Sequence, residues 1–228
     1  MVVTTEPTDP ATRDDELPTL VVLGGPPPPL APLRTAAARV IAVDSGIDHA
    51  LAAGRTVDVA VGDFDSVSDV GLDRLGRSGA RIDRHDAAKD ATDLELALEV
   101  AVEDRPGSIV VVGSHPDQRI DHWLGTVLCL ASPRWRPSRI EAHLGAARLV
   151  PVHDRATLDV ESDAVISLFA LHGDAELRST SGLAWPLRDD VLLAGSSRGV
   201  SNVATAERVE VAVDSGVVLV VVPGPGGA

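Results

Sequence analysis

The sequence predicts an α/β fold: an N-terminal doubly wound, mostly parallel sheet domain followed by a smaller antiparallel β-sandwich domain. Two observations lead to this prediction. Over residues 17–135, apolar runs rich in β-branched residues alternate with helical segments, which is typical of parallel strands buried on both faces. Over residues 139–222, short β-rich runs are separated by turn residues and no helical pattern lies between them, which is typical of a sandwich or barrel.

In the first domain, each strand is expected at an apolar run and each helix in the segment that follows it. The segment 91–103 shows the helical pattern best, because its leucines, alanines and valines form one broad face and its acidic residues lie elsewhere. The expected strands are 17–25, 39–46, 57–65, a short one at 80–86, and 108–114. The expected helices are 31–38, 47–53, 69–78, 91–103 and 119–131.

The second domain is expected to begin after a boundary near residues 132–138, where prolines and arginines interrupt the pattern. Residues 1–16 are polar and aperiodic and are expected to form a mobile tail, and residues 223–228 a second tail. The expected strands of this domain are 139–145, 147–152, 156–160, 164–171, 190–195, 208–216 and 217–222.

Charge and cysteine content narrow the functional class. The formal net charge is −14, which argues against nucleic acid as a partner, because phosphate binding requires a basic surface. No apolar run is long enough to span a membrane, and no signal peptide is visible at the N-terminus. The single cysteine, Cys129, allows no internal disulfide and fits a reducing compartment. We therefore expect a cytoplasmic protein with no membrane partner.

Carboxylates follow several of the predicted strands. Asp44 follows the second strand, Asp63 and Asp65 follow the third, and Asp121 follows the last. Asp90 and Asp93, with Thr92 between them, lie at the start of the helix 91–103. Ligands bind at the carboxyl edge of an open parallel sheet, so these side chains are expected to converge there around Mg²⁺, a cation that takes oxygen ligands and substrate phosphates. The alternative is that they are turn and cap residues, with Asp90 capping the helix and Asp93 as its N3 partner.

Several short motifs resemble those of the thiamine pyrophosphokinase family. Residues 62–66 read Gly-Asp-Phe-Asp-Ser and residues 89–93 read Lys-Asp-Ala-Thr-Asp, and both match family motifs without a change. The segments 44–48 and 115–122 are similar to two further motifs, and 181–187 and 198–202 are similar to motifs of the second half. The resemblance runs in order from about residue 19 to residue 222.

The resemblance implies a homodimer with active sites between subunits, in which ATP gives its terminal pyrophosphoryl group to thiamine. In the first domain, Asp63, Asp65 and Asp93 would hold Mg²⁺. Asp121 would position or activate the thiamine hydroxyl, and Arg119 would stabilise charge on the phosphates. The residues implied around ATP are Asp44, Gly46, Asp48, Lys89, Asp90, Thr92, Arg119 and His122. The partner subunit would supply Ser201 and Asn202 to thiamine.

Four positions depart from the family pattern: Ser45 replaces a small glycine, Asp48 replaces an asparagine, and His115 and Pro116 stand where glycines are usual. For Trp185, a place in the core of the β domain is favoured over stacking on thiamine, because few other aromatic residues could fill that core.

Two other functions remain open. The first is a pyrophosphokinase for another heterocyclic alcohol, which would need the same metal and nucleotide motifs. The second is a non-catalytic nucleotide-binding relative, against which the retained cluster of repelling carboxylates argues.

Overall fold

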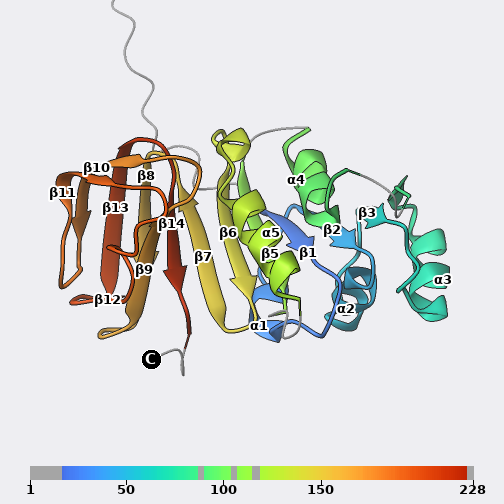
Figure 1. Ribbon diagram of the computed structural model, residues 1–228. Helices are drawn as coiled ribbons and strands as arrows, with labels where there is room; N and C mark the ends of the chain where they lie inside the picture. The colour runs from blue at the N-terminus through green and yellow to red at the C-terminus, as the bar shows by residue number, and fades with distance from the viewer. Residues whose placement is uncertain (1–16, 87–89, 104–106, 115–118, 225–228) are drawn as a thin grey trace, which may run out of the picture.

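The structure is a computed structural model, and it describes residues 17–86, 90–103, 107–114 and 119–224. Its main feature is a ten-stranded sheet with the order β12-β9-β14-β7-β6-β5-β1-β2-β3-β4 (Figure 1). Six neighbouring strands of this sheet run parallel, which confirms the predicted class of fold. These are β1 (Thr19–Val22), β2 (Arg39–Val43), β3 (Val59–Gly62), β4 (Arg81–Arg84), β5 (Ser108–Gly113) and β6 (Arg139–Leu144).

Helices cover both faces of the parallel strands, which explains their continuous apolar runs. On one face, Val21, Ile41 and Val61 pack with residues of α4 and α5. On the other face, Leu20 and Ala42 pack with residues of α1, α2 and α3. The helices are α1 (Leu30–Leu33), α2 (Gly46–Ala52), α3 (Asp69–Ser78), α4 (Asp93–Glu103) and α5 (Ile120–Leu130), and a 3₁₀ turn, η2 (Pro133–Trp135), precedes β6.

The second half is a sandwich of two antiparallel layers. One layer continues the long sheet with β7 (Ala147–Val152), β14 (Val218–Val222), β9 (Val165–Ala170) and β12 (Asn202–Val203). The other is a four-stranded sheet of order β11-β10-β13-β8, formed by β11 (Arg188–Leu192), β10 (Ala175–Ser181), β13 (Arg208–Ser215) and β8 (Arg155–Asp159). A core with Leu168, Leu177 and Val211 fills the space between the layers, as predicted for the C-terminal domain.

The two halves share one hydrogen-bonded sheet. Strand β6 pairs in parallel with β5 and antiparallel with β7, so the predicted strand 139–145 extends the parallel sheet. Figure 1 shows the β-only half and the helix-bearing half side by side, with β12 and β3 far apart along the sheet. The positions of the two halves are therefore fixed by backbone hydrogen bonds.

Three local predictions were wrong. The helix expected at 31–38 is a single turn, Leu30–Leu33, because Ala38 N–H already bonds Pro18 O and starts the next strand. Strand β10 was missed, although it is central in its sheet. It contains Glu176, Arg178 and several hydroxyl residues, and its buried face depends on Ala175, Leu177 and Thr180. The strand expected at 190–195 is β11, Arg188–Leu192.

The tails were predicted at residues 1–16 and 223–228. Residues 1–16 and 225–228 lie outside the described residues. Among the helices that the structure describes, none is both long and apolar enough to cross a membrane.

Candidate functional site

The candidate site lies at the carboxyl edge of the parallel strands. Strands β2, β3 and β4 follow β1 on one side, and β5 and β6 follow it on the other. The strand order therefore reverses at β1, and ligands of open α/β sheets bind at such a point. The turns after β1, β2 and β3 meet there and contain Gly25, Asp44 and Asp63.

The turn after β3 holds the predicted metal ligands in a backbone shape that few residues allow. Gly62 has φ +138° and Phe64 has φ +66°, and both lie where side chains are normally disfavoured. Phe64 N–H donates to Asp44 Oδ1 at 3.3 Å, and Asp65 N–H donates to Asp63 Oδ1 at 3.0 Å. These bonds hold the two aspartates next to each other.

Arg84 supports the same turn from β4. Its Nη1 donates to Asp63 O at 2.8 Å, and its guanidinium lies 4.8 Å from the centre of the buried Phe64 ring, a favourable cation–π distance. Arg84 was not among the residues predicted from the sequence. The only signal was its position at the end of the strand beside β3.

Asp44 and Gly46 are fitted closely to the neighbouring strands. A Cβ atom on Gly62 would lie 1.9 Å from Asp44 Oδ1, and a Cβ atom on Gly46 would lie 2.2 Å from Val22 O. Two residues of the predicted nucleotide set are thus fixed by the turns around them. The contact of Asp44 requires glycine at position 62, and the contact with Val22 requires glycine at position 46 itself.

Asp48 lies against the start of α3. Its Oδ2 accepts from Ser68 N–H at 2.9 Å and its Oδ1 accepts from Ser68 O–H at 2.5 Å, while Ser68 Oγ accepts from Gly71 N–H as the cap of α3. The carboxylate that replaces an asparagine therefore links α2 to α3. Its assignment to ATP stays a prediction.

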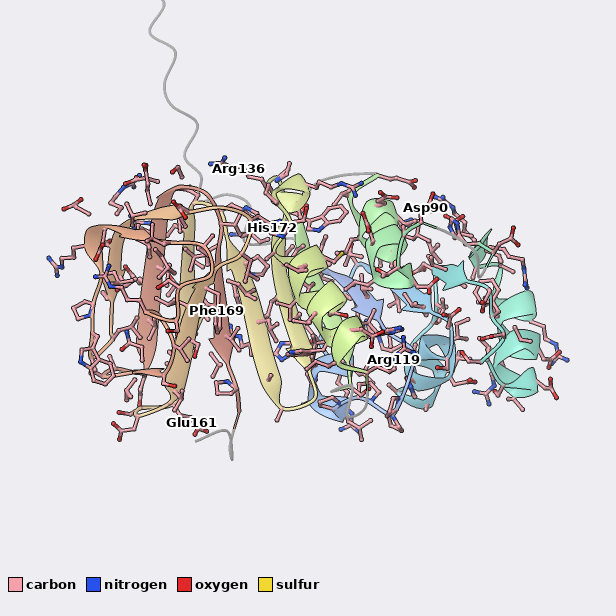
Figure 2. The ribbon with its side chains drawn as sticks, in the orientation of Figure 1. Asp90, Arg119, Arg136, Glu161, Phe169 and His172 are labelled. Atoms are coloured by element: carbon pink, nitrogen blue, oxygen red, sulfur yellow. The ribbon has the colours of Figure 1, made fainter. Side chains whose placement is uncertain are left out.

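The motif before α4 is described only in part, because Lys89 lies outside the described residues, as do His115 and Pro116. Thr92 Oγ1 accepts from Glu95 N–H at 3.3 Å, so the threonine helps to cap α4. Asp90 is exposed and precedes it. Figure 2 shows Asp90 and Arg119 well apart.

Arg119 and Asp121 form an exposed pair at the start of α5. The guanidinium donates through Nε at 2.9 Å to Asp121 Oδ1 and through Nη2 at 2.7 Å to Oδ2. The hydrogen bond from Arg119 holds the pKa of the Asp121 carboxyl far below its usual range, and the carboxylate raises the pKa of Arg119. Asp121 is therefore ionised and a weak base. His122, beside it, is also exposed.

The predicted Mg²⁺ ligands match the metal in chemistry, because Asp63, Asp65 and Asp93 offer hard carboxylate oxygens. Over the described residues, no three side chains from histidine, cysteine, aspartate and glutamate lie close enough together to hold a metal. Mg²⁺ is usually bound through one or two carboxylates together with substrate phosphates. The pair Asp63 and Asp65 therefore fits it.

A cavity of about 510 Å³ lies at the far end of the sheet, by β12. Its lining includes Trp185, Arg198 and the predicted thiamine residues Ser201 and Asn202. Trp185 is 63% exposed, so the expectation that it fills the β core was wrong. Leucines and valines fill that core instead.

Asn202 presents Trp185 at this cavity. The buried Asn202 side chain accepts from Trp185 N–H at 3.1 Å and donates to Trp185 O at 2.8 Å, and it also accepts from Val203 N–H. Ser201 has φ +59°, and its N–H donates to Ser167 Oγ at 3.0 Å. The Asn202 amide is thus occupied by the backbone, while the Trp185 indole is open to a ligand.

Two family models match most of the chain. The model for the thiamin pyrophosphokinase catalytic domain matches residues 30–143, and the model for the thiamin pyrophosphokinase vitamin B1 binding domain matches residues 155–218. A thiamine pyrophosphokinase of Bacillus subtilis (strain 168) is 29% identical over 165 residues, which are 71% of this chain and 76% of the relative.

Solved structures show the same fold. The crystal structure of thiamine pyrophosphokinase from Bacillus subtilis superposes with a TM-score of 0.76 at 26% identity, covering 90% of this chain and 98% of the other. The thiamin pyrophosphokinase from Geobacillus thermodenitrificans gives 0.74 at 23% identity, covering 92% and 98%. The enzyme from Candida albicans gives 0.69 at 13% identity, covering 90% and 88%. The last two show the fold alone.

Proposed function

Because this chain belongs to the thiamin pyrophosphokinase family and is therefore an enzyme that pyrophosphorylates thiamine, we propose that it uses ATP and releases AMP. The thiamine hydroxyl oxygen bonds to the β-phosphorus, and the bond between that phosphorus and the oxygen bridging to the α-phosphate breaks. The hydroxyl proton passes to solvent water, and AMP leaves with the bridging oxygen. The observation that carries the proposal is the turn 62–65, which is held by Asp44 and Arg84 at the carboxyl edge of the sheet.

We assign Asp63 and Asp65 to the metal. Asp93 is proposed as a third ligand that would have to approach this pair on binding, because over the described residues no three such side chains lie close enough together. When bound, Mg²⁺ neutralises charge on the phosphates of ATP. Asp44 and Arg84 keep the turn in shape before any ligand arrives, so the binding of ATP and metal costs little ordering of the chain.

Arg119 and Asp121 are proposed to act on the reacting groups. A guanidinium can donate two hydrogen bonds to phosphate oxygens. The exposed Arg119 binds Asp121 through Nε and Nη2, so its Nη1 can donate to such a partner while the pair with Asp121 stays intact. The lowered pKa of Asp121 makes it a poor general base. We therefore assign it to accepting a hydrogen bond from the thiamine hydroxyl and orienting it. Gly46, Asp48, Lys89, Asp90, Thr92 and His122 remain proposed nucleotide residues.

We further propose a homodimer in which each site combines two subunits. Eight strand spacings separate β12, beside the cavity at Trp185, from β3, which leads to Asp63. At about 4.8 Å per spacing, this is about 38 Å along the sheet, too far for one thiamine to contact both. Exposed apolar residues on α5, Ile120, Leu124 and Leu128, offer a surface that a second copy could cover.

The first test measures AMP release from Mg²⁺-ATP with and without thiamine, and identifies the product by mass. Thiamine-dependent AMP and a thiamine diphosphate mass are expected. Asp63→Asn should abolish turnover without destabilising the fold, and Asp73→Asn on α3, an exposed ion-pair residue, is the control. AMP release only with another alcohol would favour the related pyrophosphokinase, and nucleotide binding without turnover would favour the non-catalytic relative.

A mixing experiment tests the shared site. Asp63→Asn and Trp185→Ala subunits are inactive separately if both residues are needed. In a mixed dimer with shared sites, one of the two sites combines the intact halves. Equal mixing should then restore about one quarter of the wild-type activity, because half of the dimers are mixed. If each chain holds a complete site, mixing restores nothing, and the shared-site proposal is wrong.

A further inference from the structure

The turn after β2 connects to the turns on both sides of it. Asp44 Oδ1 accepts from Phe64 N–H in the turn after β3. Ser45 Oγ accepts from Gly25 N–H at 3.0 Å in the turn after β1. Gly46 approaches Val22 O at the end of β1 so closely that a Cβ atom would lie 2.2 Å away. Three successive residues therefore fix the two neighbouring turns of the site.

Both backbone polar groups of Gly25 contact side chains of or beside α2. Besides the bond from its N–H to Ser45, its carbonyl oxygen lies 2.8 Å from His49 Nε2. A carbonyl can only accept, so His49 Nε2 carries a proton and donates. Ser45 is the N-cap of α2 and His49 lies one turn further along the helix, and together they form a two-point clamp on Gly25, which has φ +95°.

The clamp holds the beginning of a segment that has no backbone N–H groups to form hydrogen bonds of its own. Residues 26–29 are four prolines, which have fixed φ angles and no backbone N–H to donate. Buried Pro28 and the core residue Leu33 of α1 hold the far end of this rigid segment by packing, and its near end is set by hydrogen bonds where it begins, at Gly24 and Gly25. A Cβ atom on Gly24 would lie 3.0 Å from Ser45 Oγ, so the turn packs directly on the serine.

The side chain of Ser45 does not cap its own helix. It occupies the N-cap of α2, but its side chain makes no cap hydrogen bond, whereas an N-cap serine normally accepts from its own helix. Its hydroxyl oxygen instead accepts a hydrogen bond from Gly25 in the turn after β1. The substitution of a family glycine by Ser45 therefore has a structural purpose in this chain.

We propose that Ser45 and His49 are positioning residues for the nucleotide: they fix the turn at Gly24 and Gly25 and the proline segment as one wall of the ATP site. This rests on the proposed function, because the turn lies where the strand order reverses, beside Asp44 and the turn 62–65. Neither residue needs to contact ATP. Their effect is to keep one wall of the site in place before ATP binds.

The test measures the Kd of Mg²⁺-ATP without thiamine, the KM values of both substrates, and the free energy of unfolding. Ser45→Ala and His49→Ala should each weaken ATP binding about five- to tenfold, since each removes one hydrogen bond that orders the wall. The KM of thiamine should stay within about twofold. His49→Gln, which can still donate, should recover most of the ATP affinity.

Matched controls exist elsewhere in the chain. His172 Nε2 lies 2.8 Å from Leu128 O in a similar exposed contact, and Ser132 Oγ accepts from Arg134 N–H. His172→Ala and Ser132→Ala should match the two test variants in stability but leave the Kd of ATP unchanged.

Three results have different meanings. If Ser45→Ala and His49→Ala bind ATP with the same Kd as the controls, the proposal that the clamp positions the wall of the ATP site is wrong. A wild-type chain that binds ATP but releases no AMP contradicts the proposed function only, and the clamp is then judged on Kd alone. A wild-type chain that binds no ATP overturns both.

Discussion

Replacing Gly62 by alanine tests how the turn 62–65 is built. The new Cβ atom would lie 1.9 Å from Asp44 Oδ1, and the backbone has φ +138°. Backbone strain of this kind costs about 1–3 kcal/mol. Displacing Asp44 also removes its charged hydrogen bond to Phe64 N–H, worth about 1.5–3 kcal/mol. We expect Gly62→Ala to lower the free energy of unfolding by about 3–5 kcal/mol, with the two costs partly shared.

Two control glycines, one inside α3 and one at its C-cap, separate the backbone strain from the contact with Asp44. Gly79 has φ +76° and no heavy atom within 4 Å of an added Cβ, so Gly79→Ala should cost only about 1–2 kcal/mol for the backbone. Gly76 lies inside the helix, also with open space around it, and Gly76→Ala should stabilise by about 1 kcal/mol. The remainder of the Gly62→Ala effect measures the contact with Asp44.

The assay is urea denaturation followed by tryptophan fluorescence, carried out also in an Asp44→Gly background. Without the carboxylate, the Gly62→Ala penalty should fall to the backbone strain alone, about 1–3 kcal/mol. If Gly62→Ala costs no more than Gly79→Ala in the wild-type background, Asp44 does not press on the turn as described. The reasoning about how Asp63 and Asp65 are presented would then be refuted.

Three further predictions concern contacts away from this turn. Asp48→Ala should cost about 1–2 kcal/mol in urea denaturation, because two hydrogen bonds from Ser68 are lost, and an unchanged stability would contradict the proposed link between α2 and α3. Asn202→Ala should lower the free energy of unfolding by about 2–4 kcal/mol, because it leaves Trp185 N–H, Trp185 O and Val203 N–H without the Asn202 side chain as a partner. Asn202→Asp keeps the acceptor oxygen and should cost less. Equal losses in the two variants would show that the amide oxygen does not carry the effect. Burial, with a smaller effect of Arg136, lowers the pKa of His153, so the unfolded chain binds the proton more readily, and stability should be constant above about pH 6.5 and decrease below it. Unfolding titrations between about pH 5 and pH 8 should show this slope in the wild type and a smaller one in His153→Phe, and identical slopes would exclude His153 as the cause.

The prediction from sequence was most accurate where one strong pattern controls the local structure. The helix 69–78 was placed correctly because Ser68 caps it and Gly79 ends it in the left-handed region. It was wrong for β10, whose buried face rests on Ala175, Leu177 and a buried threonine. That strand is stabilised by the neighbours it pairs with, β11 and β13, and a single segment gives no sign of them.

In the candidate site, too, residues in local motifs were predicted and residues that act through distant contacts were missed. The motif at 62–66 identified Asp63 and Asp65, but Arg84, Ser45 and His49 act through hydrogen bonds across 20 or more positions, such as the contact between Gly25 and Ser45. Trp185 was assigned to the core because the sequence has few aromatic residues. Its exposure follows from the fit of leucines and valines between two layers, which composition does not reveal.

By itself, the sequence determined the class of fold, the order of most elements and the family, since these depend on periodicity and on short motifs that are local along the chain. The tertiary structure alone decided that one sheet runs through both halves. It also decided that Asp44, Ser45 and Gly46 tie three turns together, and that the two predicted halves of the site lie about 38 Å apart along the sheet. These features depend on which strands become neighbours, and that is set by packing among residues distant in the chain.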